Sequence, residues 1–262
     1  YMATTGYYPI GKIELGSVFS LVSGNPVEKY RFAFALRTSD AFSKKIELGG
    51  KIGYGIRDQK FKYNALIRYN VPGKKRGMLS VFYNFDIQQI GQSPSAAALG
   101  TTFSTVFNTA PFDKLTFVKK AGFGFEKDIK KDIIIYTAAE WKQYNPLGLT
   151  SYLYYNPLTS ITDTLSSIRT TEFTGRLRWT KDEEFISGSF SRTSVTSVFP
   201  IFSLQAIIGV KGIGGSQYNY QKLEFQMEHY TQLGVFGRMR YGCTAGYIFG
   251  ATAYPFLKVH EG

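Results

Sequence analysis

Cysteine and histidine are scarce in this sequence, which contains Cys243 alone and only His229 and His260 among 262 residues. A disulfide framework within the chain and a cysteine-rich zinc or iron–sulfur site are therefore excluded. Charged residues make up only 19% and aromatic residues 16%, which excludes a disordered chain. No apolar run approaches the roughly 18 residues that a transmembrane helix needs. No basic and apolar leader opens the chain at Tyr1, so we interpret it as a mature form or a fragment.

The charge balance is strongly basic, because 31 Lys and Arg against 19 Asp and Glu give a net charge of +12. A basic protein of this kind raises the question of nucleic-acid binding. The basic residues are spread through turns and along one face of the expected strands, where Asp and Glu are interleaved with them. We therefore expect no nucleic-acid partner, and we expect residues 1–262 to form a single all-β domain.

Strict alternation of apolar and polar side chains is the dominant pattern of the sequence. Residues 44–57 show it best, since their even positions are mainly apolar and their odd positions are charged or glycine. Successive side chains of a strand point to opposite faces, so this pattern predicts a strand with one apolar and one polar face. The same alternation predicts about twelve strands: 10–21, 27–37, 44–57, 60–70, 78–88, 114–127, 132–142, 168–180, 184–193, 199–211, 218–230 and 235–249.

Many of these strands run ten to fourteen residues, which matches a tilted strand that crosses a bilayer better than the five or six residues usual in soluble proteins. Tyr54, Tyr69, Trp141 and Trp179 lie near strand ends on the apolar face, as in the aromatic girdles of outer-membrane barrels. A β-sandwich and a lipocalin-like barrel are the soluble alternatives. The sequence favours an all-β, antiparallel transmembrane outer-membrane β-barrel, with lipid outside and charges inside.

Two long connections, about 89–112 and 143–167, interrupt the short polar turns. Alternation of strand direction places both at the same end, which we assign to the cell exterior because outer-membrane barrels carry their longer loops there. A short helix over Ser95–Leu99 is the one helical feature that we expect.

Several segments resemble an uncharacterised outer-membrane family of Bacteroidota, whose members are usually named carboxypeptidase-like regulatory domain-containing proteins. These segments are Asn25–Phe32, Arg37–Lys44, Tyr54–Tyr63, Gly209–Gly212, Asn219–Glu224, Gly246–Gly250 and Tyr254–Gly262. The resemblance implies a location in the bacterial outer membrane and a barrel that continues past Gly262. It also implies a β-sandwich accessory domain, which nothing in this chain matches. It implies no peptidase and no assigned reaction.

Charged residues project from the polar face of the expected strands, and the sequence leaves two interpretations of them open. They form either an internal ion-pair network that holds the barrel wall or a selectivity lining for anionic solutes. The residues in question are Arg31, Arg37, Lys45, Glu47, Lys51, Arg68, Glu172, Arg176, Arg178, Glu224, Glu228, Arg238 and Arg240.

Basic turn residues are the second set with a binding interpretation. They are either solvated turn residues or partners of anionic lipid headgroups and lipopolysaccharide phosphates. The residues in question are Lys74, Lys75, Arg76, Lys127, Lys130 and Lys131.

Catalytic patterns are weak throughout. The segment 209–216 resembles a phosphate loop but lacks the Gly-Lys-Ser/Thr ending and a following helix, so it predicts a turn. Glu140 and Glu172 could act as an acid/base pair, but any barrel interior brings such carboxylates together by chance. We therefore expect no catalytic, cofactor or metal site.

The first function hypothesis is a structural or accessory subunit of an envelope complex for assembly, secretion or surface-protein handling, which contacts outer-membrane or periplasmic proteins. The second is a channel for small polar or anionic solutes, and an outer-membrane enzyme has the least support.

Overall fold

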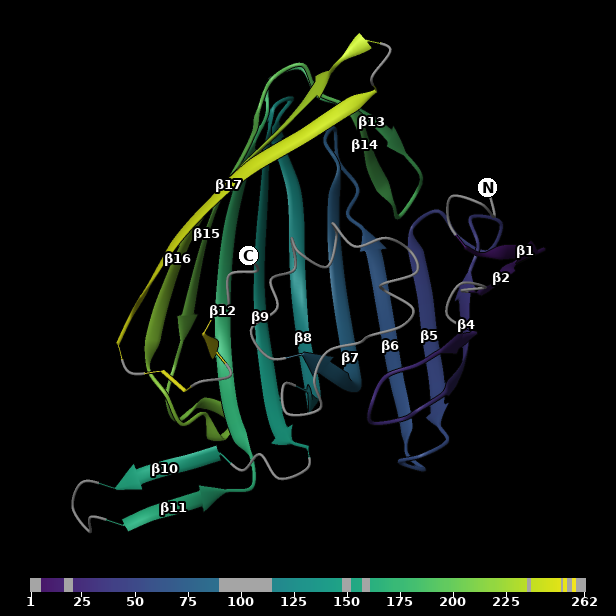
Figure 1. Ribbon diagram of the computed structural model, residues 1–262. Helices are drawn as coiled ribbons and strands as arrows, with labels where there is room; N and C mark the ends of the chain where they lie inside the picture. The colour runs from purple at the N-terminus through teal and green to yellow at the C-terminus, as the bar shows by residue number, and fades with distance from the viewer. Residues whose placement is uncertain are drawn as a thin grey trace.

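In the described residues of the computed structural model, most of the alternating segments form one antiparallel sheet of 13 strands (Figure 1). The structure describes residues 6–16, 21–89, 115–147, 152–156, 161–234, 237–250, 252–253 and 256–257. The strands of eight or more residues are called wall strands here. They are β4 (Arg31–Thr38), β5 (Ile46–Gly55), β6 (Phe61–Asn70), β7 (Gly77–Gln89), β8 (Leu115–Lys130), β9 (Ile133–Pro146), β12 (Ile168–Trp179), β15 (Ile201–Gly209), β16 (Tyr220–Gln232) and β17 (Arg238–Phe249).

The wall strands are hydrogen-bonded in chain order, each antiparallel to the next. The pairing is long and regular, as where β9 and β12 match residue by residue from Ile168 opposite Tyr144 to Trp179 opposite Ile133. The all-β antiparallel architecture expected from the alternation is therefore confirmed.

Two of the expected strands are wrong as wall strands. Of the expected strand 10–21, the described residues 10–16 belong to a short hairpin of β1 (Tyr8–Ile10) and β2 (Ile13–Gly16), because Gly11 adopts a φ of 61° and reverses the chain. Only the four residues of β2 pair with β4. Residues 184–193 contribute to a separate hairpin of β13 (Glu184–Ser187) and β14 (Arg192–Thr196). Gly188 donates its backbone N–H to the Ser191 carbonyl 2.9 Å away, which closes a turn in the middle of the expected strand. Turn residues therefore override the alternation in both segments.

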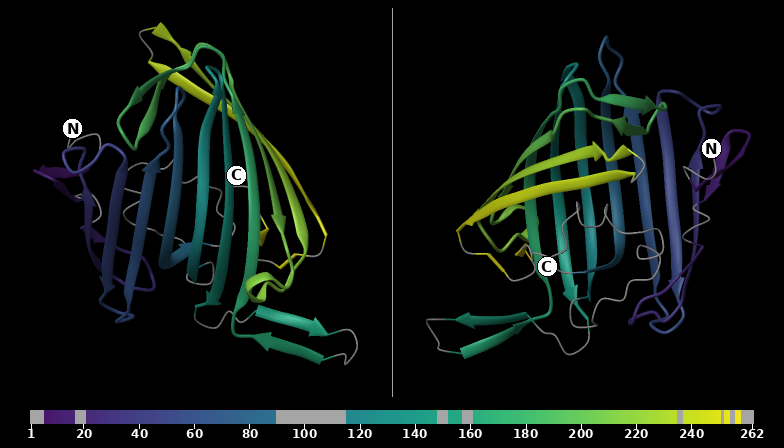
Figure 2. Two further views of the ribbon diagram at one scale, coloured as in Figure 1. Left: turned by 180° about the vertical axis from the view of Figure 1, so that it is seen from behind. Right: turned by 45° about the horizontal axis from the view of Figure 1, so that its top comes forward.

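The sheet curls strongly about one side, and its two ends are easily told apart (Figures 1 and 2). Short turns after β4, β6, β8 and β16 lie at the end drawn at the top of Figure 1, here called the upper end. The hairpin of β10 (Tyr152–Asn156) and β11 (Ile161–Leu165) lies at the opposite, lower end. The first and last strands of the sheet, β1 and β17, do not pair with each other in the described residues, so the barrel is open there.

The long connections agree only in part with expectation. The chain leaves β7 and β9 at the lower end, so the connections that follow these two strands share one end as predicted. Between β12 and β15, the expected strand 184–193 is replaced by the β13–β14 hairpin, which lies at the upper end. Ser95–Leu99 and nearly all of 89–112 lie outside the described residues. Among the described residues no helix has the length and apolarity needed to cross a bilayer.

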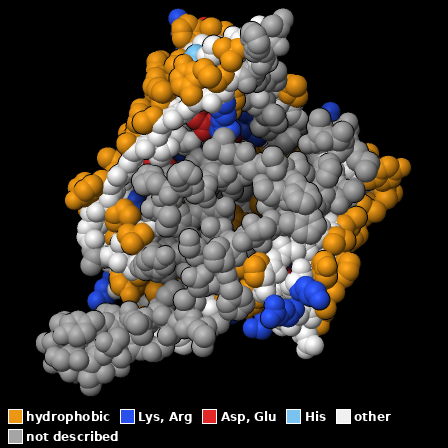
Figure 3. Space-filling model, viewed as in Figure 1, with side chains coloured by type: hydrophobic (Ala, Val, Ile, Leu, Met, Phe, Trp, Pro, Cys, Tyr) orange, Lys and Arg blue, Asp and Glu red, His pale blue; other side chains and the backbone are white. Residues whose placement is uncertain are grey.

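The two faces of the wall differ as the alternation predicts. On the convex outer face Phe32, Leu48 and Ile67 are 54%, 44% and 49% exposed. On the concave inner face Glu47 and Lys62 are only 4% and 2% exposed. Figure 3 shows hydrophobic side chains along the outer margin and charged ones inside the hollow near the upper end. A water-soluble fold would bury the apolar face and leave the charged face in solvent.

Some of the buried apolar residues of the described chain form two small clusters, and none of the described residues forms a central core. One joins Val27 to Leu115, and the other joins Ile168, Tyr220 and Phe256. With so little apolar burial, the hydrogen bonds of the sheet and the ion pairs of its inner face hold the wall together.

Candidate functional site

The inner face of the wall holds most of the charged side chains that the fold brings together. The strands supply them at alternate positions, so residues far apart in the sequence meet across neighbouring strands. Three groups can be separated: a cluster around Glu28 and a cluster around Lys142, both toward the lower end, and a set of arginines at the upper end.

The Glu28 cluster consists of Glu28, Arg31, Asp58, Lys62 and Asp86. Glu28 is completely buried in the turn before β4. It lies 2.8 Å from Arg31 Nη2 and 2.6 Å from Lys62 Nζ. Lys62 also pairs with Asp58, and Arg31 reaches across to Asp86 on β7. Three carboxylates thus face two cations.

Two further residues complete this cluster. Lys51 on the inner face of β5 interacts electrostatically with Asp86 and supplies the third positive charge. Asn25 accepts hydrogen bonds at 3.0 Å from the backbone N–H groups of Val27 and Glu28 and donates its side-chain amide to Glu28. The turn is therefore shaped by a side chain that also fixes the buried carboxylate.

Burial by itself would raise the pKa of Glu28, but the hydrogen bonds from Arg31 and Lys62 outweigh burial and hold the pKa below its ordinary 4.5. Because the folded pKa is depressed, the stabilisation is present above pH 4.5 and is lost as the pH falls through the lower, folded value. We expect Glu28→Gln to lower the free energy of unfolding by about 2 kcal/mol at pH 7. The difference from the parent should shrink below pH 4.5 in urea titrations of the two proteins.

The control for this prediction is Glu184→Gln, at an exposed position where β13 begins. The control should match the parent at every pH. A difference between Glu28→Gln and the parent that stays constant from pH 7 to pH 3 would contradict the assigned role of the carboxylate.

The Lys142 cluster takes its residues from four wall strands and consists of Lys120, Glu140, Lys142, Glu172 and Tyr220. Glu140 on β9 lies 2.7 Å from Lys120 Nζ on β8 and 2.8 Å from Lys142 Nζ. Lys142 also lies 2.6 Å from Glu172 on β12. The two lysines and two glutamates therefore neutralise one another.

Tyr220 closes the Lys142 cluster from β16. Its hydroxyl donates to Glu172 and lies 3.0 Å from the hydroxyl of Thr170. The Tyr220 ring lies over Gly209 on the neighbouring strand, where any side chain would overlap it. Glycine is thus required at position 209 for the tyrosine to reach the carboxylate.

The β13–β14 hairpin folds over the inner face at the upper end. Arg192 pairs with Asp128 of β8 at 2.7 Å. Farther along, Arg68 and Asn70 of β6 donate at 2.7 Å to the carbonyls of Phe190 and Ser189 in the hairpin turn. The hairpin leaves the wall after β12 and is tied to β8 and β6, so it spans part of the upper opening.

A cavity of about 220 Å³ lies between this hairpin and the wall, and it is called the arginine pocket here. It is lined by Glu126, Ile134, Tyr136, Arg176, Arg178, Phe185, Arg192 and Ser194. Most of the charges at the pocket cancel in pairs: Arg178 with Glu183, Arg192 with Asp128, and Glu126 with Arg76.

Arg176 is the exception in the arginine pocket. Its guanidinium lies over the Tyr136 ring, 5.0 Å from the ring centroid, and among the described residues no carboxylate pairs with it. The pocket therefore presents one uncompensated positive charge to the interior.

Residues 8–260 match the C-terminal domain of a family of unknown function, DUF5686. The chain belongs to this family. No curated protein matches the chain.

Among solved structures, the DUF5686 domain is similar to BamA from Haemophilus ducreyi lacking POTRA domains 1–3, with 11% sequence identity and a TM-score of 0.49. The similarity covers 93% of this chain and 42% of that chain, so the DUF5686 domain spans less than half the length of the BamA chain. At this identity the likeness concerns the fold alone.

The structure of the DUF5686 domain brings most of the sequence-predicted charges into ion pairs. Those with a carboxylate or cation within 4.0 Å are Arg31, Arg37, Glu47, Arg68, Glu172, Arg178, Glu228 and Arg240. Glu224 lies on the inner face of β16 opposite Gln205. Lys45 is different, because it lies exposed in the turn before β5 rather than on the inner face. The side chain of Arg238 lies outside the described part of the structure.

Sequence reasoning missed several members of the DUF5686 clusters, chiefly Glu28, Lys120, Lys142 and Tyr220. Lys119 and Lys120 are adjacent, so charge alone does not show which of them faces inward. The β8–β9 register resolves this, because it sets Lys120 opposite Lys142. The β9–β12 register then sets Glu140 opposite Glu172 on the same face. That register depends on the connection through β10 and β11, which no local pattern predicts.

Proposed function

We propose that this DUF5686 domain is the wall of an integral outer-membrane barrel and serves as a non-catalytic structural or accessory subunit of an envelope complex. The complex would act in protein assembly, secretion or handling of surface proteins. The observation that carries the proposal is the opposite exposure of the two faces. Apolar side chains cover the outer face while the charged ones lie sheltered on the inner face.

The outer face supports a location in lipid. Tyr69 and Trp179 lie on it toward the upper end of the wall, and Tyr54 and Trp141 lie toward the lower end. Two aromatic belts separated by an apolar band are typical of a barrel that crosses a bilayer. A sheet in hydrocarbon must satisfy its edges, so the open edges at β1 and β17 require further strands or a partner.

The inner face supports a structural role, because most of its charged side chains form ion pairs with one another. In the Lys142 cluster each carboxylate is held by a lysine, which leaves no free acid or base for catalysis. Among the described residues no group of three or more His, Cys, Asp or Glu is placed to hold a metal ion. We propose accordingly that the domain works without a cofactor and that its partners are outer-membrane lipid and other envelope proteins.

The segments that resemble the Bacteroidota carboxypeptidase-like regulatory domain family support a finer proposal. The complete protein would belong to that group and carry the accessory β-sandwich outside this chain. A periplasmic accessory domain suits a subunit that contacts other envelope proteins.

The arginine pocket favours a second candidate function, the passage of small anionic solutes through the barrel. Arg176 places one uncompensated positive charge on the inner face, as an anion-selective lining requires. The cancellation of the other charges at the pocket favours the structural role over this alternative.

One experiment on the complete protein separates the two functions. The structural role predicts that the protein fractionates with the outer membrane, copurifies with envelope proteins after gentle solubilisation, and carries no anion current in planar bilayers. A protein that always runs alone would contradict it. The channel predicts an anion-selective current, which Arg176→Gln should reduce several-fold and Arg176→Lys should restore.

A further inference from the structure

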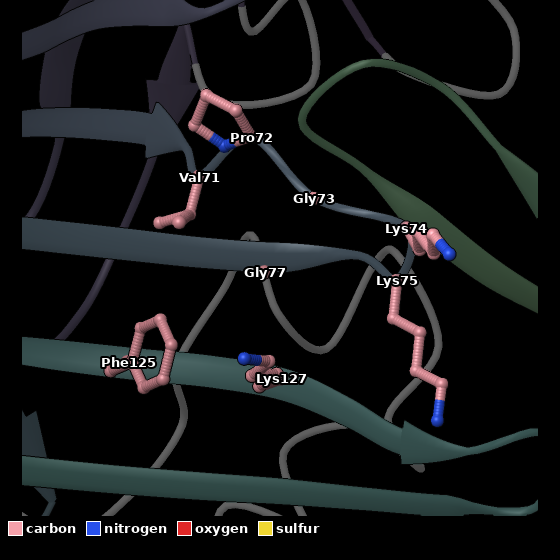
Figure 4. Close-up of a pocket in the computed structure, with 8 residues that line it drawn as sticks. All are labelled: Val71, Pro72, Gly73, Lys74, Lys75, Gly77, Phe125 and Lys127. Carbon is pink, nitrogen blue, oxygen red and sulfur yellow. The ribbon is translucent and has the colours of Figure 1, made fainter.

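A shallow groove on the outer face at the upper end differs from the rest of the wall. It lies between the turn that joins β6 to β7 and the last residues of β8, and it has a volume of about 220 Å³ (Figure 4). It is called the lysine groove here, and it is lined by Val71, Pro72, Gly73, Lys74, Lys75, Gly77, Phe125 and Lys127.

The lining combines an apolar floor with cations. Val71 and Phe125 lie near each other on one side of the groove, and Figure 4 shows the lysines along its other parts. None of the eight lining residues is acidic, whereas most charged groups described on the inner face pair with opposite charges. The groove therefore carries three positive charges with no carboxylate among its own residues.

The cations in and near the lysine groove differ in whether they already have a partner. Arg76, within the same turn, pairs with Glu126 on the inner face at 2.7 Å. Lys75 donates to the backbone carbonyl of Ile129. Lys74 and Lys127 are exposed, and in the described part of the chain no carboxylate pairs with either. Arg76 is thus directed inward, and Lys74 of the turn and Lys127 of β8 remain available on the outside.

The position of the groove relates it to the apolar band. On β8, Phe123 and Phe125 precede Lys127 at alternate positions, so all three share the outer face. Phe123 and Val81, which lies opposite it on β7, are both exposed on that face. The apolar band therefore ends at the groove, and the cations begin there.

We propose that the lysine groove binds the phosphate-bearing headgroup of a membrane lipid. The phosphate contacts Lys74 and Lys127, and the first part of the acyl chain lies along Phe125 and Phe123. The inference rests on the proposed location in a membrane, because only there does a band of exposed apolar side chains adjoin a layer of phosphates. Ammonium groups are suitable partners for phosphate, and an apolar floor next to them distinguishes a lipid from a free anion.

The test uses the complete protein purified in detergent and measures bound lipid by native mass spectrometry after adding phosphatidylglycerol. The double variant Lys74→Gln/Lys127→Gln should bind this lipid about 20-fold more weakly than the parent. The matched control is Lys44→Gln/Lys45→Gln, which removes the same charge from exposed lysines in another turn at the upper end and should bind as the parent does. Equal weakening in both double variants would overturn the site.

Two further arms identify the occupant. Diacylglycerol, which has the same chains without the phosphate, should bind equally weakly to parent and variant. Inorganic phosphate should not displace phosphatidylglycerol, and displacement by millimolar phosphate would mean that the groove binds free anions instead.

Failure of this inference is distinguishable from failure of the proposed function. A protein that remains in the outer-membrane fraction but shows no lysine-dependent retention of phosphatidylglycerol removes the groove alone. A protein that is absent from the membrane fraction removes both.

Discussion

Replacing Glu172 by alanine is expected to lower the free energy of unfolding by about 3–5 kcal/mol, the cost of removing one partner from a buried ion pair. Glu172 is almost fully buried between Lys142 and Tyr220. Its loss leaves Lys142 to Glu140 alone, although Glu140 already serves Lys120. The measurement is urea unfolding in lipid vesicles, followed by the fluorescence of the two tryptophans.

Two further variants serve as comparisons for Glu172→Ala. Glu228→Ala removes a similar cross-strand partner from Arg240, but that pair is more exposed and should cost at most about 1 kcal/mol. The double variant Lys142→Met/Glu172→Met removes both charges together and should recover most of the loss, because no unpaired charge remains. Equal costs for Glu172→Ala and Glu228→Ala would mean that the interior is as well hydrated as the rim.

A charged substitution on the outer face is expected to have the second large effect on the free energy of unfolding. Ile67→Arg is expected to cost about 2–4 kcal/mol, because it places a cation near the middle of the apolar band. Ile67 is half exposed, and its cross-strand neighbours Leu48 and Val81 are exposed apolar residues too. In a water-soluble protein the same change at an exposed isoleucine would be nearly neutral. The sign and size of this effect therefore separate a lipid-facing wall from a solvated one.

Ile46→Arg is the matched control for Ile67→Arg. Ile46 is the first residue of β5, also exposed on the outer face but at the end of the strand. Near the membrane interface the same substitution should cost only about 0–1 kcal/mol. If both variants unfold at the urea concentration of the parent, the proposed membrane location is wrong.

Much of the wall follows from the sequence. In β5 the alternation correctly predicts that Ile46, Leu48 and Ile52 share one face and that Glu47 lies on the other. The sequence also predicts the long strands and their antiparallel order, because consecutive strands joined by short polar turns usually pair with each other.

The failures occur where turn residues and alternation compete. Residues 184–193 alternate well enough to resemble a wall strand, yet the turn at Gly188 folds them into a hairpin over the interior. The charged interior shows a related limit. Arg68 was correctly expected on the polar face, but its contact with the carbonyl of Phe190 depends on where that hairpin comes to rest.

The sequence by itself determined the two faces of this protein, because the direction of a side chain in a strand repeats every two residues and needs no knowledge of the partner strand. Only the tertiary structure decided which charges meet. Strand register and the long connections place residues 30 or more positions apart next to each other, as where Lys142 contacts Glu172. The same register places Arg176 beside the Tyr136 ring, where no carboxylate among the described residues pairs with it. Pairing across such distances depends on the register between neighbouring strands and has no local signature in the sequence.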